Sequence, residues 1–468
     1  MSRHPAGLAG VEPRPGGAEC PGVASRPGIP APLRQSRFVS FDGAVSLTTS
    51  HQRPDRYRHL EADLGTRKRI ARGAGLSYAA ASFGDATIVQ EMRAFNRLLR
   101  FDAEQGTVTV EAGLPVGDLL AWTARHGLYI PVLPGYPTIT VGGCIAADIH
   151  GKNPLRDGTF SDWVESLTLY HPALGFHRVD AATMPDRFAA TCGGFGLTGT
   201  IIDATLRLIP LPAHHAGLRG EPVGSLGQSI AELHANPEAD FGYSWHDGAA
   251  RGSAFGRGVV FFGSWTDAPG GRADHGYRPM SSSARARIPL SMWNPVTVRL
   301  ANAWFRHDAT RGARVTPLFR AMFPFATQTS YHRFYGRPGL AEVQVLVPDA
   351  GVDEFVQQLT RLVQRIDPPL VMMSVKLFRG RQRSLSVSGA GALFALDLRR
   401  TGAVARFLAE FDALMLATGA QPNLAKDSRL PAGIAARALP GYDSFRSRLW
   451  QLDPDRLYQS ELSQRLHL

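Results

Sequence analysis

The chain has 468 residues, of which 44% are hydrophobic and 19% are charged, and its net charge is +11. This length suggests two or three domains with a sizeable core, and it excludes a disulfide-stabilised mini-protein, a collagen-like fibre and a wholly disordered chain. Three widely spaced cysteines, Cys20, Cys144 and Cys192, support neither a disulfide framework nor a structural zinc site. The longest uncharged apolar stretch, residues 127–147, is broken by three prolines, so no transmembrane helix is expected.

Arginine supplies nearly all of the positive charge, because only four of the 51 basic residues are lysines: Lys68, Lys152, Lys376 and Lys426. The basic side chains are scattered and form no stripe interleaved with aromatics. A solvated surface is therefore the preferred interpretation, with binding to nucleic acid or to an anionic membrane as the alternative. In such a chain, a lysine within a motif is of special interest, because its compact ammonium group differs chemically from a guanidinium.

Residues 1–37 contain seven prolines and six glycines, a composition that predicts a disordered tail. The tail lacks the apolar central run of a secretory signal peptide. We therefore expect the folded part to begin near Phe38.

The next segment, up to about Pro212, mixes short strands with glycine-rich turns. A strand is expected at 107–110, followed by a helix that begins after Pro115 and ends before Gly127. A second strand is expected at 200–208. Residues 213–340 show no pattern that assigns elements.

Residues 341–426 are more regular. Strands are expected at 342–347, 370–378 and 392–398, with helices at 352–363 and from an N-cap at Thr401 to a stop at Gly419. A last extended piece leads to Lys426. The order β-α-β-β-α-β is that of a split ferredoxin-like arrangement.

Alternation along these strands predicts what each face of the sheet carries. One face, under the two helices, should hold the side chains of Val343, Val345, Val347, Val375, Leu377, Phe394, Leu396 and Leu398. The opposite face should hold Glu342, Gln344, Lys376 and Asp397. Such a polar face is either wet or lines a ligand cleft.

Three glycine-rich segments carry the candidate chemistry. In the first, 72–78, alternate glycines let the backbone approach an anion, although an ordinary turn is the simpler interpretation. In the second, Gly142 and Gly143 open a helix of small residues where a diphosphate could approach, and His150 and Lys152 follow. The third, 193–199, matches neither the dinucleotide-binding fingerprint nor a P-loop.

In this order, the three segments resemble those of FAD-binding oxidoreductases of the vanillyl-alcohol-oxidase/p-cresol-methylhydroxylase type. Within that family they are similar to the oxidase subunits of decaprenylphosphoryl-β-D-ribose 2′-epimerase, on residues 130–135, 140–153, 425–429 and the C-terminal end. The resemblance implies an α+β fold with a two-part FAD-binding domain at 38–212. It further implies a substrate domain at 213–420, built on an antiparallel sheet, and a segment at 421–468 that returns to the FAD-binding domain.

The resemblance implies FAD that is bound non-covalently, because Leu76 stands where many relatives carry a histidine joined to the flavin. These residues are implied to contact FAD: Arg72, Gly73, Ala74, Gly75, Leu76, Ser77, Tyr78, Pro134, Gly135, Thr140, Gly142, Gly143, Ala146, His150, Lys152, Gly194, Gly196, Gly199 and Lys426. We expect Lys426 to be catalytic, as a cation near flavin N1, with His150 or Tyr78 as the proton acceptor. Substrate contacts are expected from Lys376, Gln344, Asp397 and Trp245.

The implied reaction is oxidation of the 2′-hydroxyl of a polyprenyl-phospho-ribose, a precursor of cell-wall arabinan, to a ketone. A short-chain reductase would then complete the epimerisation, in the cytoplasm or at the inner surface of the membrane. Leu393, Ala395 and Glu342 depart from the group's residues, which are asparagine, cysteine and glutamine, and Ala79–Ala81 replaces Gly-Asp-Asn. A soluble sugar or aldonolactone oxidase of the same fold, and a nucleic-acid-binding protein without chemistry, therefore stay as alternatives.

Overall fold

The computed structural model describes residues 31–267, 290–324 and 330–468, and its strands form four sheets. Most of the expected tail, residues 1–30, lies outside the described residues. Folded structure begins before the expected boundary at Phe38, because strand β1 already pairs with β2 from Arg34 onward, opposite His51. This pairing partner lies outside the tail, so the composition of the tail could not reveal it.

The strands between Arg34 and Pro210 form three of the sheets. The first has the order β1 (Arg34–Val39), β2 (Ser46–Gln52), β4 (Thr87–Glu91) and β3 (Lys68–Arg72). The second has the order β5 (Leu98–Asp102), β6 (Thr107–Glu111), β10 (Thr200–Arg207), β8 (Val164–His171) and β9 (Gly175–Asp180). The third pairs β11 (Ile209–Pro210) with β7 (Leu128–Tyr129).

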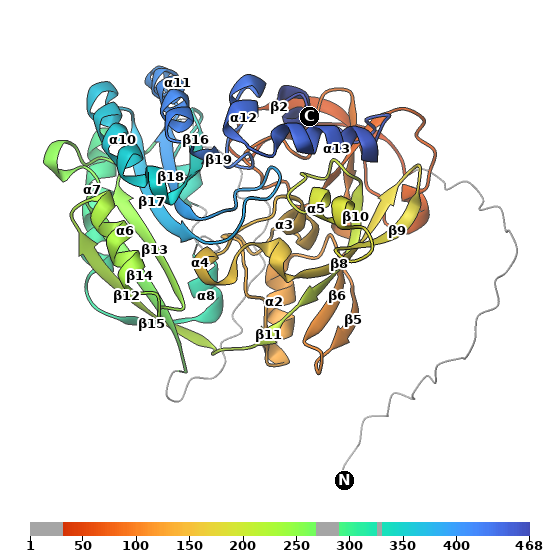
Figure 1. Ribbon diagram of the computed structural model, residues 1–468, viewed down its shortest axis with the longest axis horizontal. Coiled ribbons are helices and arrows are strands. Elements are labelled where there is room, and N and C mark those ends of the chain that lie inside the picture. The colour runs from red at the N-terminus through yellow and green to blue at the C-terminus, as the bar shows by residue number, and fades with distance from the viewer. Residues whose placement is uncertain (1–30, 268–289, 325–329) are drawn as a thin grey trace, which may run out of the picture.

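The strands from His215 onward form one antiparallel eight-stranded sheet, which Figure 1 shows on the other side of the molecule. Its order is β15 (Arg314–Pro317), β12 (His215–Val223), β14 (Gly258–Thr266), β13 (Phe241–Asp247), β17 (Leu370–Phe378), β18 (Gly391–Arg399), β16 (Leu340–Val347) and β19 (Gln421–Pro422). Residues 213–340, which the sequence pattern left unassigned, thus supply four of its strands.

The described helices are α1 (Tyr57–Leu60), α2 (Val116–Arg125), α3 (Val141–Ala146), α4 (Pro154–Asp157), α5 (Pro185–Thr191), α6 (Leu226–Ala235), α7 (Pro295–Ala309), α8 (Leu318–Met322), α9 (Ser330–Arg333), α10 (Val352–Ile366), α11 (Gly402–Ala417), α12 (Ala432–Ala438), α13 (Tyr442–Leu452) and α14 (Glu461–Arg465). Within the described ranges, none of them is both long and apolar enough to cross a bilayer.

The elements expected between 341 and 426 are present. The chain follows the order β16-α10-β17-β18-α11-β19, and β18 lies between β16 and β17 and is antiparallel to both. Gly419, with φ +65°, follows the end of α11. Thr401 does occupy the N-cap of α11, but its side chain makes no capping hydrogen bond.

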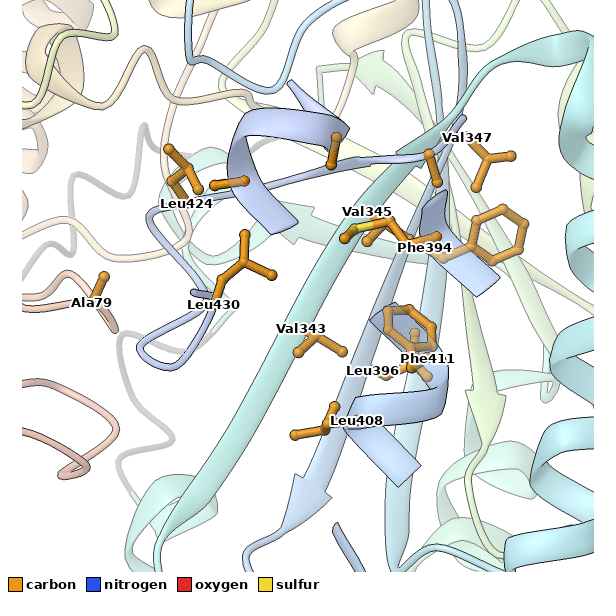
Figure 2. Packing of buried hydrophobic residues seen from close by; sticks show 14 of the residues in the cluster. Ala79, Val343, Val345, Val347, Phe394, Leu396, Leu408, Phe411, Leu424 and Leu430 are labelled. Carbon is orange, nitrogen blue, oxygen red and sulfur yellow. The ribbon is translucent and has the colours of Figure 1, made fainter. Parts of the chain in front are cut away.

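Helices α6, α10 and α11 cover one face of the eight-stranded sheet. As expected from the alternation, Val343, Val345 and Val347 point under the helices, together with Phe394 and Leu396. In Figure 2 these side chains face Leu408 and Phe411 of α11. The ring of Phe394 lies 4.8 Å from that of Phe355 on α10, and both are almost fully buried, so this layer is a large apolar core.

The opposite face of the sheet is also covered. Glu342, Gln344 and Asp397 are each less than 10% exposed, although the sequence suggested a face that could be wet. Helix α7 and the loops of residues 72–78 and 150–163 lie against this face, so its polar groups point into the interior of the molecule.

The C-terminal segment packs on the N-terminal sheets, above which α12 and α13 lie in Figure 1. The backbone N–H of Arg69 on β3 donates to Leu457 O at 2.8 Å, and Glu461 N donates to Phe83 O at 2.8 Å. Residues 457–461 therefore hold β3, which leads into the first glycine-rich segment, and the chain that follows that segment.

We expect Phe394→Ala to lower the free energy of unfolding by about 3–5 kcal/mol, because it opens a cavity between α10 and the sheet. Leu174→Ala is the control, since Leu174 is 52% exposed and its loss should change stability by less than about 0.5 kcal/mol. Urea unfolding followed by circular dichroism measures both. Equal losses in the two variants would contradict the described core.

Candidate active site

The first glycine-rich segment follows β3 and packs tightly against the second. A Cβ atom added to Gly73 would lie 2.2 Å from Thr140 Oγ1, and one added to Gly75 would lie 2.1 Å from Arg72 Nη2. Gly75 also has φ +66°, a conformation that side chains rarely adopt. The Arg72 guanidinium is held by Ser82 Oγ at 2.7 Å and by the ring of Phe38. Glycine is therefore required here for close packing.

The same segment presents a row of backbone donors. Among the described residues, the N–H groups of Gly75, Leu76 and Ser77 have no hydrogen-bond acceptor. Successive N–H groups in a turn form an anion-binding concavity, so this row suits a phosphate group. The sequence pattern suggested an anion contact at this segment and also at the start of α3.

At the start of α3 the first backbone donors already have acceptors within the protein. The N–H groups of Val141, Gly142 and Gly143 already donate to Leu114 O, Ala112 O and Thr140 Oγ1. Gly142 is needed because a Cβ there would lie 2.9 Å from the Cβ of Ala112. Gly142 therefore lets α3 pack against the chain after β6, and the first donors of the helix are not available to a ligand.

The third glycine-rich segment packs against the C-terminal end of α3. Gly193 N donates to Ile145 O at 3.0 Å, and Phe195 N donates to Ala146 O at 2.8 Å. Gly196 faces β3, where an added Cβ would lie 3.5 Å from Ile70. All three glycine-rich segments thus meet around α3.

Two glycines of the third segment are explained by packing inside the protein. A Cβ on Gly194 would lie 1.9 Å from Ala190 O, and one on Gly199 would lie 3.0 Å from Tyr170 O. Both glycines are buried, and the nearest atoms to an added Cβ are backbone oxygens of the protein. The structure therefore gives them a packing role.

Aromatic side chains gather beside the first segment. The Tyr78 ring lies 5.0 Å from Phe41 and 6.4 Å from His332, and Tyr136 lies 5.8 Å from both of these rings. Tyr136 directly follows Pro134 and Gly135. Phe41, Tyr136 and His332 were missed by sequence reasoning, because no local pattern joins residues so far apart.

Lys426 is brought to Tyr78 by the segment after β19. Ala425 O accepts hydrogen bonds from the backbone N–H groups of both Tyr78 and Ala79, at 3.1 and 3.2 Å. As a result, the Lys426 ammonium lies 3.9 Å from the centre of the Tyr78 ring and 3.2 Å from Glu342 Oε1. A cation between a ring face and a carboxylate is held in one position.

Glu342 and Asp397 are directly opposite each other on β16 and β18. Gln344 Nε2 donates to Glu342 Oε1 at 2.6 Å, and Tyr331 Oη donates to Asp397 Oδ2 at 2.5 Å. Burial, and next the negative charge of Glu342, raise the pKa of Asp397 above its usual value. Burial likewise raises the pKa of Tyr78, which stays a phenol at neutral pH.

Lys376 and Lys152 lie at the other end of this face. Lys376 Nζ donates to Gly151 O at 3.0 Å, and Lys152 Nζ donates to Ala321 O. Burial is the main cause that lowers the pKa of Lys376 to about 8 and that of Lys152 to about 7. Within the described ranges, Lys426 is the only lysine with a carboxylate within ion-pair distance, so no carboxylate contacts the ammonium of Lys376 or Lys152.

His150 stands two residues before Lys152 and next to Gly151, the residue that Lys376 contacts. Its ring packs at 5.0 Å against Phe378, and its Nδ1 lies 3.1 Å from Gly151 O. Burial, followed by the charge of Lys376, lowers the pKa of His150 to about 3. The imidazole is therefore neutral at neutral pH.

Trp245, expected to bind substrate, is on β13 in the same cross-strand row as Ser374, Ala395 and Gln344. Its ring packs against Phe305 of α7 at 4.6 Å. It therefore closes the site on the side of α7.

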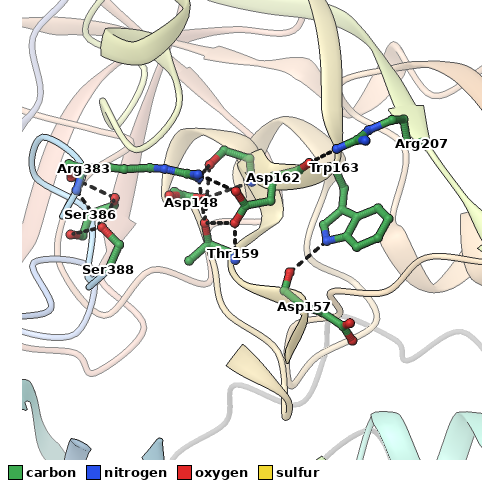
Figure 3. Close-up of polar contacts among 10 residues, drawn as sticks. Asp148, Asp157, Thr159, Asp162, Trp163, Arg207, Arg383, Ser386 and Ser388 are labelled. Carbon is green, nitrogen blue, oxygen red and sulfur yellow. Dashed lines mark hydrogen bonds and ion pairs between the residues drawn. The ribbon is translucent and has the colours of Figure 1, made fainter. Parts of the chain in front are cut away.

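The loop between β17 and β18 fastens the eight-stranded sheet to the N-terminal part, as Figure 3 shows. The guanidinium of Arg383 binds Ser161 Oγ at 2.7 Å, Thr159 Oγ1 at 3.3 Å and the carboxylate of Asp162. Thr159 forms a β-bridge with His150. The loop therefore fixes the position of His150 relative to Lys376.

This arrangement fits FAD. A row of backbone donors without acceptors, at glycines whose added Cβ atoms would collide, provides a place for a diphosphate. The half-buried lysines and the buried carboxylates provide a charged surface of the kind that tunes a redox-active ring. Among the described residues, the N–H groups of Gly75, Leu76 and Ser77 have no acceptor, so no hydrogen bond has to break before they bind a ligand.

Comparisons with known proteins agree with this fit. A family model described as an FAD binding domain matches residues 65–175. The decaprenylphosphoryl-β-D-ribose oxidase of Mycolicibacterium smegmatis is 31% identical over 87% of this chain and 91% of its own length. A Streptomyces coelicolor protein, described only as uncharacterized and encoded in the mprA 5′ region, is 27% identical over 73% of this chain and 96% of its own length.

Relatives with other activities match smaller parts. The L-gulonolactone oxidase of Mus musculus is 32% identical over 25% of this chain and 27% of its own length. The chain is thus an oxidoreductase with FAD as its cofactor. By its likeness over nearly the whole length, it belongs to the family of FAD-binding oxidoreductases that includes decaprenylphosphoryl-β-D-ribose oxidase.

Proposed function

We propose that the protein oxidises a secondary hydroxyl group of a sugar that carries a phosphate, and that its substrate is the 2′-hydroxyl of a polyprenyl-phospho-ribose. The main support is that three of the four lysines in the chain meet at one sheet face, Lys376 from β17 itself and Lys152 and Lys426 from loops that lie against it. Two of these ammonium groups have no carboxylate partner among the described residues. A phosphate would compensate both charges.

FAD, when bound, supplies the acceptor for the hydride that leaves the substrate carbon. Lys426 would place a fixed positive charge beside the ring, since Tyr78 and Glu342 hold its ammonium in one position. Gln344 and Lys376 would hold substrate hydroxyl or phosphate groups. The residues of segment 72–78 would hold the diphosphate.

The hydroxyl proton needs an acceptor. Tyr78 is unsuited because its raised pKa keeps it protonated, and His150 is a weak base because its pKa is lowered to about 3. Asp397 is the better acceptor in its ionised form, since its raised pKa makes it a stronger base than His150 and Tyr331 fixes its carboxylate. We therefore assign Asp397 this role, with His150 as a neutral hydrogen-bonding group.

We further propose that residues 38–212 are an FAD-binding domain, that 213–420 are a substrate domain and that 421–468 return to the former. In this proposal the unit β16-α10-β17-β18-α11-β19 is a ferredoxin-like element. FAD would be non-covalent, since Leu76 offers no nucleophile. A short-chain reductase would use the ketone. Oxidation of a free sugar or an aldonolactone is the alternative, and mouse L-gulonolactone oxidase supports it over only part of the chain.

Anaerobic titration of the holoenzyme tests the substrate. At about pH 6, polyprenyl-phosphoribose should bleach the flavin at concentrations roughly a hundredfold lower than free ribose or an aldonolactone, because two charge-assisted contacts are lost without the phosphate. This preference should shrink at about pH 9, where Lys376 and Lys152, with pKa values of about 8 and 7, have lost their protons. Equal bleaching by free ribose at both pH values would refute the phosphate role.

Lys426→Ala should leave FAD bound but slow bleaching by substrate about a hundredfold to a thousandfold, because the fixed charge beside the ring is lost. FAD content is measured in the supernatant after acid precipitation, which also checks for non-covalent binding. Lys68→Ala is the matched control, since the Lys68 ammonium binds Asp455 O on the surface. Near-normal bleaching in Lys426→Ala would remove Lys426 from this role.

Asp397→Asn should stabilise the protein more at high pH than at low pH. Burial raises the pKa of Asp397 to about 8, whereas the unfolded state releases this proton above about pH 4. Between these two pH values the folded state holds a proton that the unfolded state has lost, so the free energy of unfolding falls as the pH rises. The variant should melt about 2 °C or more above the parent at pH 9, with a smaller gain at pH 5.

The same variant should lose most of its rate of flavin reduction. Asp353→Asn, at an exposed position on α10, is the control for both measurements. A gain in stability that does not change with pH, or an unchanged rate of reduction, would contradict the assignment of Asp397.

A further inference from the structure

Helix α7 exposes an apolar stripe to solvent. Val296, Leu300 and Trp304, at i, i+4 and i+8, are 63%, 67% and 67% exposed. Just before the helix, Leu290 and Met292 are 78% and 50% exposed. Contiguous exposed apolar side chains of this kind are unusual on a protein surface and indicate an interaction site.

The part of the chain that carries the stripe is strongly basic. Residues 290–324 and 330–340 contain seven arginines and one acidic residue, Asp308, which is paired with Arg314 at 2.8 Å. At 100° per residue, Arg299 and Arg306 lie along one edge of the stripe, and both are exposed. The face thus combines an apolar centre with positive charge.

The inner side of α7 is firmly attached, so the exposed stripe does not reflect a loosely packed helix. Asn302 Nδ2 donates to Asp247 Oδ1 at 2.7 Å and to Val371 O at 2.9 Å. Val298 belongs to the same buried cluster as Tyr78 and Tyr335. The helix therefore has its inner side against the candidate active site and its outer side in solvent.

We propose that the outer face of α7 docks onto an anionic lipid bilayer, with the stripe in the interfacial region and the arginines on the lipid phosphates. A basic amphipathic helix with a tryptophan on its apolar side suits this environment. A second copy of the chain suits it less, because it would bring a further set of arginines against Arg299 and Arg306.

This inference deepens the proposed function, since a polyprenyl-phosphate sugar resides in such a bilayer, but the surface itself does not depend on that substrate. In this arrangement the lipid-linked sugar would pass a short distance from the bilayer to the polar sheet face beneath α7. Asp397, Tyr335 and Trp245 lie at the end of the site nearest the helix.

Vesicle flotation of the full-length, FAD-loaded protein tests the proposal. The parent should float with vesicles of mixed phosphatidylcholine and phosphatidylglycerol, less with phosphatidylcholine alone, and less as salt rises. Leu300→Asp and Trp304→Ser should each lower the bound fraction by about tenfold. Leu174→Asp and Trp450→Ser, at positions 52% and 53% exposed elsewhere, are the matched controls and should bind like the parent.

The double substitution Arg299→Glu and Arg306→Glu should abolish the preference for anionic vesicles. Flavin content and circular dichroism confirm that each variant is folded, and bleaching by a detergent-dispersed substrate should be unchanged in Leu300→Asp. Bleaching and flotation therefore test the proposed oxidation and the proposed docking separately, because a protein that does not oxidise the substrate can still float with vesicles.

A parent that does not float with anionic vesicles at low salt would overturn the inference. So would flotation of Leu300→Asp and Trp304→Ser at the level of the parent. If the parent is dimeric, and Leu300→Asp is monomeric but floats like the parent, the stripe serves self-association instead.

Discussion

The ammonium group of Lys426 connects three segments that are far apart along the chain. It lies between the ring of Tyr78, in the first glycine-rich segment, and the carboxylate of Glu342 on β16. The carboxylate of Glu342 is buried, and a buried charge is costly unless it is paired, so this contact constrains all three segments at once. The backbone hydrogen bonds from Tyr78 and Ala79 to Ala425 O fix the same junction. The relative placement of the glycine-rich segments and the polar sheet face depends on it.

The two faces of the eight-stranded sheet have different roles: one stabilises the fold, and the other carries the groups suited to chemistry. One face is apolar and carries the helices, and its burial supplies the driving force for folding. The other face carries Lys376 and buried carboxylates and lies against Lys152, and burial shifts the pKa values of Lys376, Lys152 and Asp397 toward neutrality. Groups that gain or lose protons near pH 7 are suited to proton transfer and to anion binding. This face therefore suits chemistry, although the burial of its charged groups lowers the stability of the fold.

Helix α7 also has two sides with different roles. Its inner residues complete the cluster around Tyr78, and its outer residues form an apolar and basic surface. The site thus lies one helix away from the proposed lipid surface. A substrate with a polar, phosphorylated head and a long apolar tail would match both environments.

Local pattern in the sequence determined the elements of residues 341–426 and the residues that face the helices, because the periods of helices and strands are fixed by backbone geometry. It also identified the three glycine-rich segments and the scarce lysines. Only the tertiary structure decided that the polar face is buried and that the free donors belong to Gly75–Ser77. It also showed that Phe41, Tyr331 and His332 join the site. These features arise from contacts between distant segments, such as Lys376 with Gly151 and Tyr78 with Lys426, for which no local pattern exists.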